Sequence, residues 1–258
     1  MQAYKNDPKL KAMLLEEMEN HRKKDQLIKG TYGKENGIWR GCSVGCAIHS
    51  LNLRLGKKMP TNSHLLLAEE IDVPENLIII NDAFFERLPE SLSQEWPQRF
   101  FMALQTGADL SLVWPKFIIW FLNDEKYGLT KFIKDVKIKD IFNELIELYQ
   151  GWIVTKEKPY IGKFSKIYWA ALDARAALAA LDARAALAAL DALAALAALD
   201  ALAALDARAA LAALAALDAR AALAALAALD ALDAREKYYQ IASDKLIELI
   251  EKEKCICL

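Results

Sequence analysis

The chain has 258 residues, of which 33 are basic and 35 acidic, and 55% of its residues are apolar. These values are typical of a soluble globular protein of one or two domains. They exclude a disordered chain, which would be poor in apolar residues. The net charge of −2 argues against a dedicated nucleic-acid binder, because such proteins carry a basic surface.

The first ten residues are polar and lack the apolar stretch of a secretory signal, so we expect a cytoplasmic protein. A helix is predicted over residues 8–28, because Asp7 can cap it and Pro8 occupies its first position. Its apolar stripe consists of Leu10, Met13, Leu14 and Met18.

The same predicted helix carries a carboxylate–histidine–carboxylate stripe made of Glu17, His21 and Asp25. These residues are four apart and share a helix face, so the stripe could be catalytic or metal-binding. The three basic residues at 22–24 favour a solvated face instead.

A glycine-rich segment follows, in which Gly33, Gly37, Gly41 and Gly45 recur every four residues. A glycine loop before a helix can bind an anion through backbone N–H groups, and basic side chains would support it. The candidate anion-binding residues are Lys34, Arg40 and Gly41. The loop lacks the terminal Gly-Lys-Ser/Thr of a nucleotide-binding loop, and a simple flexible loop is the alternative interpretation.

Possible metal ligands are concentrated at the end of this segment. On a helix, Cys42, Cys46 and His49 would share one face, and thiolate and imidazole are the usual ligands of zinc. The set is therefore a candidate zinc site, with a fourth ligand from His64 or Asp82. Two alternatives remain open: Cys42 could be a reactive thiol at a helix N-terminus, or the cysteines could be buried structural residues.

Apolar periodicity predicts further helices at about 42–54, 63–71, 75–88, 90–105, 110–123 and 137–150. The run Leu77–Ile80 is the best strand candidate, although no equally good partner strand occurs. Four aromatic residues are expected to pack in the core: Trp114, Phe117, Trp120 and Phe121.

The C-terminal part of the chain has a different composition, since neither glycine nor proline occurs after Gly162. A three-residue unit repeats from Leu172 to Arg235, with Leu or Arg first and Ala third. Ala, Leu and Arg are strong helix formers, so helices are predicted. A three-residue period rotates the Leu stripe around an α-helix, so we expect two to four helices that pack on one another or on the first domain.

An amphipathic helix is predicted at 236–254, with Tyr239, Ala242, Leu246, Leu249 and Ile250 on its apolar face. The last four residues match a prenylation signal at Cys255, in which a terminal Leu favours geranylgeranyl. A chance match is the alternative interpretation.

Two segments and the alanine-rich tail carry a resemblance to known proteins. The segments are Gly41–Ser50 (GCSVGCAIHS) and Gly107–Phe117 (GADLSLVWPKF). Together with the tail, they resemble a family of uncharacterised bacterial and phage-associated proteins that have a helical N-terminal domain and an alanine-repeat tail. The resemblance implies a mobile-element origin and carries no activity with it.

The sequence predicts an all-α protein with a helical globular domain at 1–165 and a repeat region at 166–258. We expect a non-enzymatic helical interaction or scaffold protein that contacts a protein partner, or a second copy of itself, through its repeat helices. No nucleic acid and no transmembrane segment are expected. The alternative is a metal- or thiol-dependent enzyme centred on Cys42, Cys46 and His49, with zinc as its cofactor.

Overall fold

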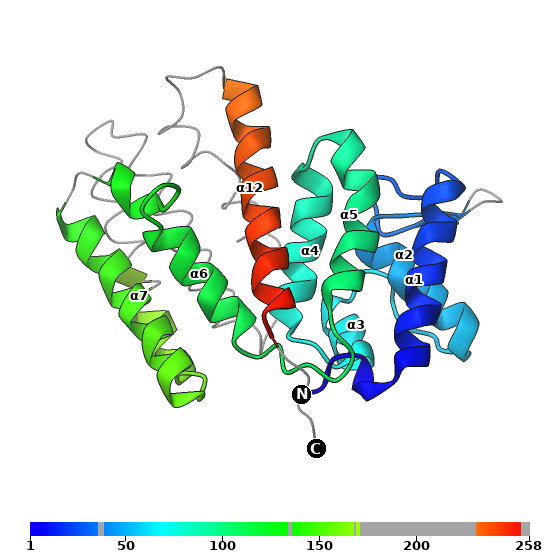
Figure 1. The fold of residues 1–258 in the computed structure, drawn as a ribbon, viewed down its shortest axis with the longest axis horizontal. Helices are drawn as coiled ribbons and strands as arrows, with labels where there is room; N and C mark the ends of the chain where they lie inside the picture. The colour runs from blue at the N-terminus through cyan, green and yellow to red at the C-terminus, as the bar shows by residue number, and fades with distance from the viewer. Residues whose placement is uncertain (36–38, 134–135, 168, 171–230, 254–258) are drawn as a thin grey trace. The chain divides into compact units, whose positions relative to one another are not determined.

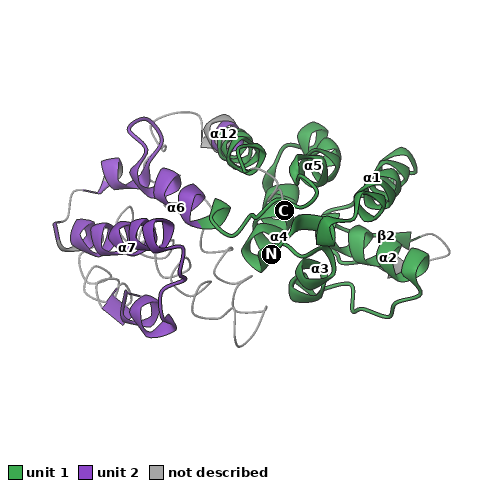
Figure 2. Cartoon of the chain, turned by 60° about the horizontal axis from the view of Figure 1, so that its bottom comes forward, with its two compact units in different colours: residues 1–114, 239–258 green, residues 115–238 purple. Residues whose placement is uncertain are grey.

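The computed structural model describes residues 1–35, 39–133, 136–167, 169–170 and 231–253 (Figure 1). The chain divides into two compact units, one made of residues 1–114 and 239–258, the other of residues 115–238 (Figure 2). The described residues are mostly helical, which confirms the predicted all-α fold class.

The first unit is a set of packed helices, with a longer connection between α1 and α2. Its elements are η1 (Ala3–Asn6), α1 (Pro8–Lys23), α2 (Ser43–Leu55), α3 (His64–Ile71), α4 (Glu75–Arg87), α5 (Glu90–Ala103) and the part of α12 (Ala231–Glu251) from residue 239 on. Helix α4 contacts α2, α3 and α5, whereas α1 packs against α2 and α5. A short antiparallel hairpin of β1 (Lys34–Glu35) and β2 (Trp39–Arg40) precedes α2.

The helix boundaries follow local capping chemistry. The Asp7 carboxylate accepts a hydrogen bond from the Lys9 N–H at 2.8 Å, which confirms the predicted N-cap of α1. Helix α1 ends at Lys23, five residues earlier than predicted. It ends there because Asp25 adopts a left-handed conformation and the next residues pair with the chain before α2, where Leu27 bridges Gly41.

The run Leu77–Ile80 lies inside α4, which confirms the helix predicted at 75–88 and shows that the alternative of a strand at this run is wrong. All four side chains are at most 6% exposed. Helix α4 is covered by three other helices, and a helix buried on several sides is apolar around its circumference. The continuous apolar run therefore reflects burial of the helix.

The second unit contains most of α6 (Val113–Asn123), η2 (Leu129–Phe132), α7 (Val136–Thr155) and a helical segment at 161–167. Its core includes Phe142, Leu145, Tyr149 and Phe164. Within the predicted aromatic cluster, Trp114 and Phe117 are buried, whereas Trp120 and Phe121 are half-buried.

The C-terminal helix α12 confirms the amphipathic helix predicted there, since Tyr239, Ala242, Leu246 and Ile250 are buried. Most of the triplet repeat, and Cys255 with its prenylation signal, lie outside the described residues. The expected domain boundary near residue 165 rests on composition and stays a prediction. Within the described part of the chain, no helix has both the length and the apolar character needed to cross a membrane.

Candidate functional site

The cysteine-containing segment lies at the start of α2, where Cys42 is the N-cap residue. Its Sγ accepts a hydrogen bond from the Gly45 N–H at 3.4 Å, as a Ser or Asp oxygen does at other helices. Its own N–H donates to the Thr31 carbonyl at 2.7 Å. These contacts hold the thiol at the helix N-terminus, where it is 1% exposed.

Two glycines of this segment allow the chain at Tyr32 to pass close to α2. A Cβ atom on Gly45 would lie 2.1 Å from the Tyr32 carbonyl oxygen, and one on Gly41 would lie 3.1 Å from it. No side chain fits at the first of these distances. The glycine at position 45 is therefore explained by close packing.

The predicted anion-binding residues lie beside this contact. The Gly41 N–H donates to the Gln26 carbonyl at 2.9 Å, so it already has an acceptor. Arg40 is exposed on β2, and the Lys34 side chain lies outside the described part of the structure. The anion site stays a prediction.

The three residues of the candidate zinc site point to different surroundings. The Cys46 thiol lies 3.4 Å from the Gly41 carbonyl oxygen and 3.7 Å from that of Gln26. The His49 ring stacks on Trp39, with ring centroids 4.1 Å apart and an interplanar angle of 5°. Cys42 lies at the cap of the helix with a different set of neighbours.

Those neighbours are two carboxylates of α4. The Cys42 Sγ and one carboxylate oxygen each from Asp82 and Glu86 all lie within 4.8 Å of one another. We call these three residues the Cys42 cluster. Asp82 was a sequence candidate, whereas Glu86 was not. The signal that could have found Glu86 is its spacing, because residues four apart share one face of the predicted helix at 75–88.

Some polar atoms around the cluster make hydrogen bonds, and others do not. The His64 Nε2 lies 3.1 Å from the Asp82 Oδ2, and Glu86 accepts the Gly30 N–H at 2.9 Å. The Asp82 Oδ1 and the His64 Nδ1 are both buried and make no hydrogen bond of ordinary geometry with the described residues, although the Tyr32 hydroxyl and the Cys42 thiol interact with the Asp82 carboxylate. A buried polar atom without a partner costs about 1–3 kcal/mol, and more when it is charged.

The electrostatics of the cluster disfavour a free thiolate. Burial raises the pKa of the Cys42 thiol well above its usual value, and the negative charge of Asp82 raises it further. Burial also raises the pKa of Glu86, and the charge of Asp82 adds to this while the Gly30 N–H opposes it. A reactive thiol at Cys42 would need the opposite environment, with positive charge nearby. A divalent cation would supply that charge.

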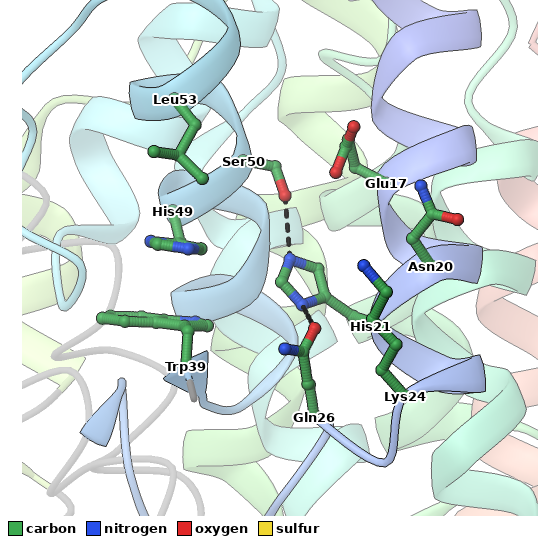
Figure 3. A pocket seen from close by; sticks show the side chains of 9 residues that line it. All are labelled: Glu17, Asn20, His21, Lys24, Gln26, Trp39, His49, Ser50 and Leu53. Atoms are coloured by element: carbon green, nitrogen blue, oxygen red, sulfur yellow. Dashed lines mark hydrogen bonds between the residues drawn. The ribbon is translucent and has the colours of Figure 1, made fainter. Parts of the chain in front are cut away.

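A second feature of this unit is a cavity of about 540 Å³ at α1 and α2 (Figure 3). We call it the α1–α2 pocket. Side chains from α1 face side chains from α2 across it, and β2 contributes an aromatic wall. Its lining residues are Glu17, Asn20, His21, Lys24, Gln26, Trp39, His49, Ser50 and Leu53.

His21 lies in this pocket at 5% exposure, so the prediction of a solvated face is wrong at this residue. Its Nε2 lies 2.9 Å from the Ser50 Oγ, and its Nδ1 lies 2.8 Å from the Gln26 Oε1. Burial lowers the pKa of His21 to about 4. The burial comes from packing of α1 on α2, which the charges of α1 alone do not reveal.

We compared the chain with protein-family models, curated proteins and solved structures, and no match was found in any of the three. The candidate sites therefore rest on the geometry of this chain.

Proposed function

We propose that the first unit binds one divalent transition-metal ion, zinc in the first instance, through Cys42, Asp82 and Glu86. The observation that carries the proposal is the close grouping of a buried thiol with two carboxylates, one of which, Asp82, has a buried oxygen that makes no hydrogen bond of ordinary geometry with the described residues. A metal ion would satisfy this oxygen and offset the negative charge of the two carboxylates.

The donor set suits zinc, which binds Cys sulfur and carboxylate oxygen at about 2.0–2.3 Å. Ligand atoms around one tetrahedral ion lie roughly 3.5 Å apart at those bond lengths. The three atoms of the Cys42 cluster are within 4.8 Å of one another, so small side-chain rotations bring them to that spacing. His64 would hydrogen-bond the Asp82 ligand, the arrangement by which outer residues orient metal ligands.

The ion would join two helices that a hydrogen-bond network already holds together. The Asn81 Nδ2 donates to the Ser43 hydroxyl at 3.0 Å. In the sequence, Ser43 follows Cys42 and Asn81 precedes Asp82. The Asn81 carbonyl in turn accepts the Trp96 Nε1–H of α5 at 2.9 Å. Metal binding between α2 and α4 would add to the folding free energy, so we infer a metal-stabilised helical domain.

The interaction role predicted for the repeat region remains a separate proposal. It rests on composition, because a Leu stripe that winds around every side of a helix requires a burial partner. The repeat would supply contacts to a protein partner or to a second copy, while the first unit supplies a metal-stabilised body. Deleting residues 172–235 should then change the oligomeric state or solubility, and unchanged behaviour would remove this role.

The metal proposal is tested by titrating the chelator-treated full chain with Zn²⁺ and measuring heat and bound metal. The background carries Cys255→Ser and Cys257→Ser, so that the C-terminal thiols do not contribute. We expect one ion per chain, and at least tenfold weaker binding in Cys42→Ser and Asp82→Asn.

Two matched variants serve as controls. Cys46→Ser removes a thiol outside the cluster, and Asp244→Asn removes an exposed carboxylate that pairs with Arg99 at 2.7 Å. Both should bind zinc as the background chain does. The proposal is wrong if the background chain binds no ion, or if Cys46→Ser weakens binding as much as Cys42→Ser.

A further inference from the structure

The α1–α2 pocket contains a chain of hydrogen bonds that the metal proposal does not use. Ser50, His21 and Gln26 follow one another at 2.9 Å and 2.8 Å through the two nitrogens of the imidazole (Figure 3). A nucleophile within hydrogen-bond reach of a base, with the base oriented by a third group, is the arrangement of covalent catalysis.

The orientation of the Gln26 amide decides which groups donate and which accept in this series of hydrogen bonds. Its Oε1 faces the His21 Nδ1, and a carbonyl oxygen can only accept. With the amide in this orientation, the neutral imidazole carries its proton on Nδ1 and offers Nε2 as an acceptor to the Ser50 hydroxyl. This is the tautomer that can remove a proton from serine.

Ser50 and His21 are 1% and 5% exposed, and the cavity that they line distinguishes this arrangement from a histidine in a closed core. Ser50 and His21 both border about 540 Å³ of space, and Figure 3 shows the serine hydroxyl directed at the imidazole. The same space is bordered by the Asn20 amide and the Lys24 ammonium, both hydrogen-bond donors. Leu53 and Trp39 add apolar surface on the facing side.

We propose that the α1–α2 pocket is an acyl-transfer site that hydrolyses small carboxylic esters, with Ser50 as nucleophile and His21 as general base. The apolar residues would hold the acyl chain. Asn20 and Lys24 would stabilise the negative charge that develops on the carbonyl oxygen.

Hydrolysis of the ester consumes one water molecule and needs no other reagent. The Ser50 Oγ forms a bond to the ester carbonyl carbon while its proton passes to the His21 Nε2. The ester C–O bond then breaks, and the leaving alcohol takes that proton. A water molecule next attacks the acyl-serine and gives a proton to His21. The Ser50–acyl bond breaks, the carboxylic acid leaves, and Ser50 regains its proton.

The experiment treats the full chain with a fluorophosphonate probe and maps the adduct by peptide mass spectrometry. Hydrolysis of p-nitrophenyl butyrate is measured in parallel. We expect the adduct on Ser50 and turnover above the buffer rate. Both should be lost in Ser50→Ala and fall at least a hundredfold in His21→Gln, because general-base catalysis contributes about 10²–10⁴-fold.

The matched control is Ser93→Ala, which removes another buried serine, one whose hydroxyl bonds to the Glu90 carbonyl of its own helix at 3.0 Å. It should label and turn over as the wild-type chain does. Circular dichroism checks the fold of each variant, and mapping of the wild-type adduct gives an answer even if Ser50→Ala fails to fold. The proposal is overturned if saturating probe leaves Ser50 unmodified, or if His21→Gln labels at the wild-type rate.

Discussion

His64 and Asp82 form a buried pair in which the His64 Nε2 lies 3.1 Å from the Asp82 Oδ2. The other polar atom of each side chain makes no hydrogen bond of ordinary geometry in the described part of the chain, although the Tyr32 hydroxyl and the Cys42 thiol interact with the Asp82 carboxylate. The His64 imidazole and the Asp82 carboxylate are thus joined by one hydrogen bond, and each could form another in its buried position. This imbalance, next to Cys42 and Glu86, is the basis of the proposed metal site.

The first prediction concerns His64 as a positioning residue. In His64→Phe the Asp82 carboxylate loses its imidazole partner, while an aromatic ring still faces Tyr32, whose ring centroid lies 5.8 Å from that of His64. We expect zinc affinity to fall by about tenfold, the lower end of the effect of outer-residue mutations. Calorimetric titration measures it. In the control His49→Phe, which keeps a ring stacked on Trp39, zinc affinity should not change.

The second prediction concerns the close contact at Gly45. Alanine there would place its Cβ 2.1 Å from the Tyr32 carbonyl oxygen, so the backbone must move. We expect Gly45→Ala to lower the free energy of unfolding by about 1–3 kcal/mol, measured by urea denaturation.

The matched control is the same substitution at Gly151 in α7, where a Cβ has no neighbour within 4 Å. Gly151→Ala should stabilise its unit by about 0.5–1 kcal/mol, because alanine favours helix. Equal stability of Gly45→Ala and the wild-type chain would contradict the packing described for Tyr32.

The third prediction follows from the pKa of His21, which burial lowers to about 4 in the folded chain against a usual value of 6.5. The Gln26 side chain and the Cys46 backbone oppose this shift because they accept hydrogen bonds from the protonated imidazole, whereas the charges of His49 and Lys24 add to it. Between pH 6.5 and 4 the unfolded chain therefore binds more protons. Stability should fall as pH falls through this range, by at most about 3 kcal/mol.

Urea denaturation of the wild-type chain and His21→Gln at several pH values measures this contribution. The difference between the two slopes isolates His21 from the other groups that face the pocket, Glu17 and His49 among them. We expect the wild-type chain to lose more stability than the variant as pH falls. Parallel slopes would mean that His21 is not buried as described.

The sequence predicted the helices of the first unit well because their apolar residues recur at helical spacing. A capping residue helped at α1, where Asp7 accepts a hydrogen bond from the Lys9 N–H at 2.8 Å. The error at Leu77–Ile80 has a physical reason, since burial on several sides of α4 makes its apolar residues continuous in sequence. Local patterns do not distinguish a buried strand from a short piece of a buried helix.

The sites were less predictable, because they depend on contacts between helices. The spacing of Cys42, Cys46 and His49 suggested one face of one helix. Helix α2 begins only after Cys42, and the Cys42 thiol caps its first turn. Its partners come from α4, about forty residues later. His21 lies in the pocket because α1 packs on α2, a contact that the sequence of α1 alone does not reveal.

The central claim is tested most directly by X-ray absorption at the zinc edge, on the zinc-loaded chain with Cys255→Ser and Cys257→Ser. We expect one sulfur ligand at about 2.3 Å and the remaining ligands as oxygen or nitrogen at about 2.0–2.2 Å. The sulfur contribution should disappear in Cys42→Ser and persist in Cys46→Ser. Two sulfur ligands, or a sulfur signal that survives Cys42→Ser, would contradict the assignment of Cys42, Asp82 and Glu86 as the ligands.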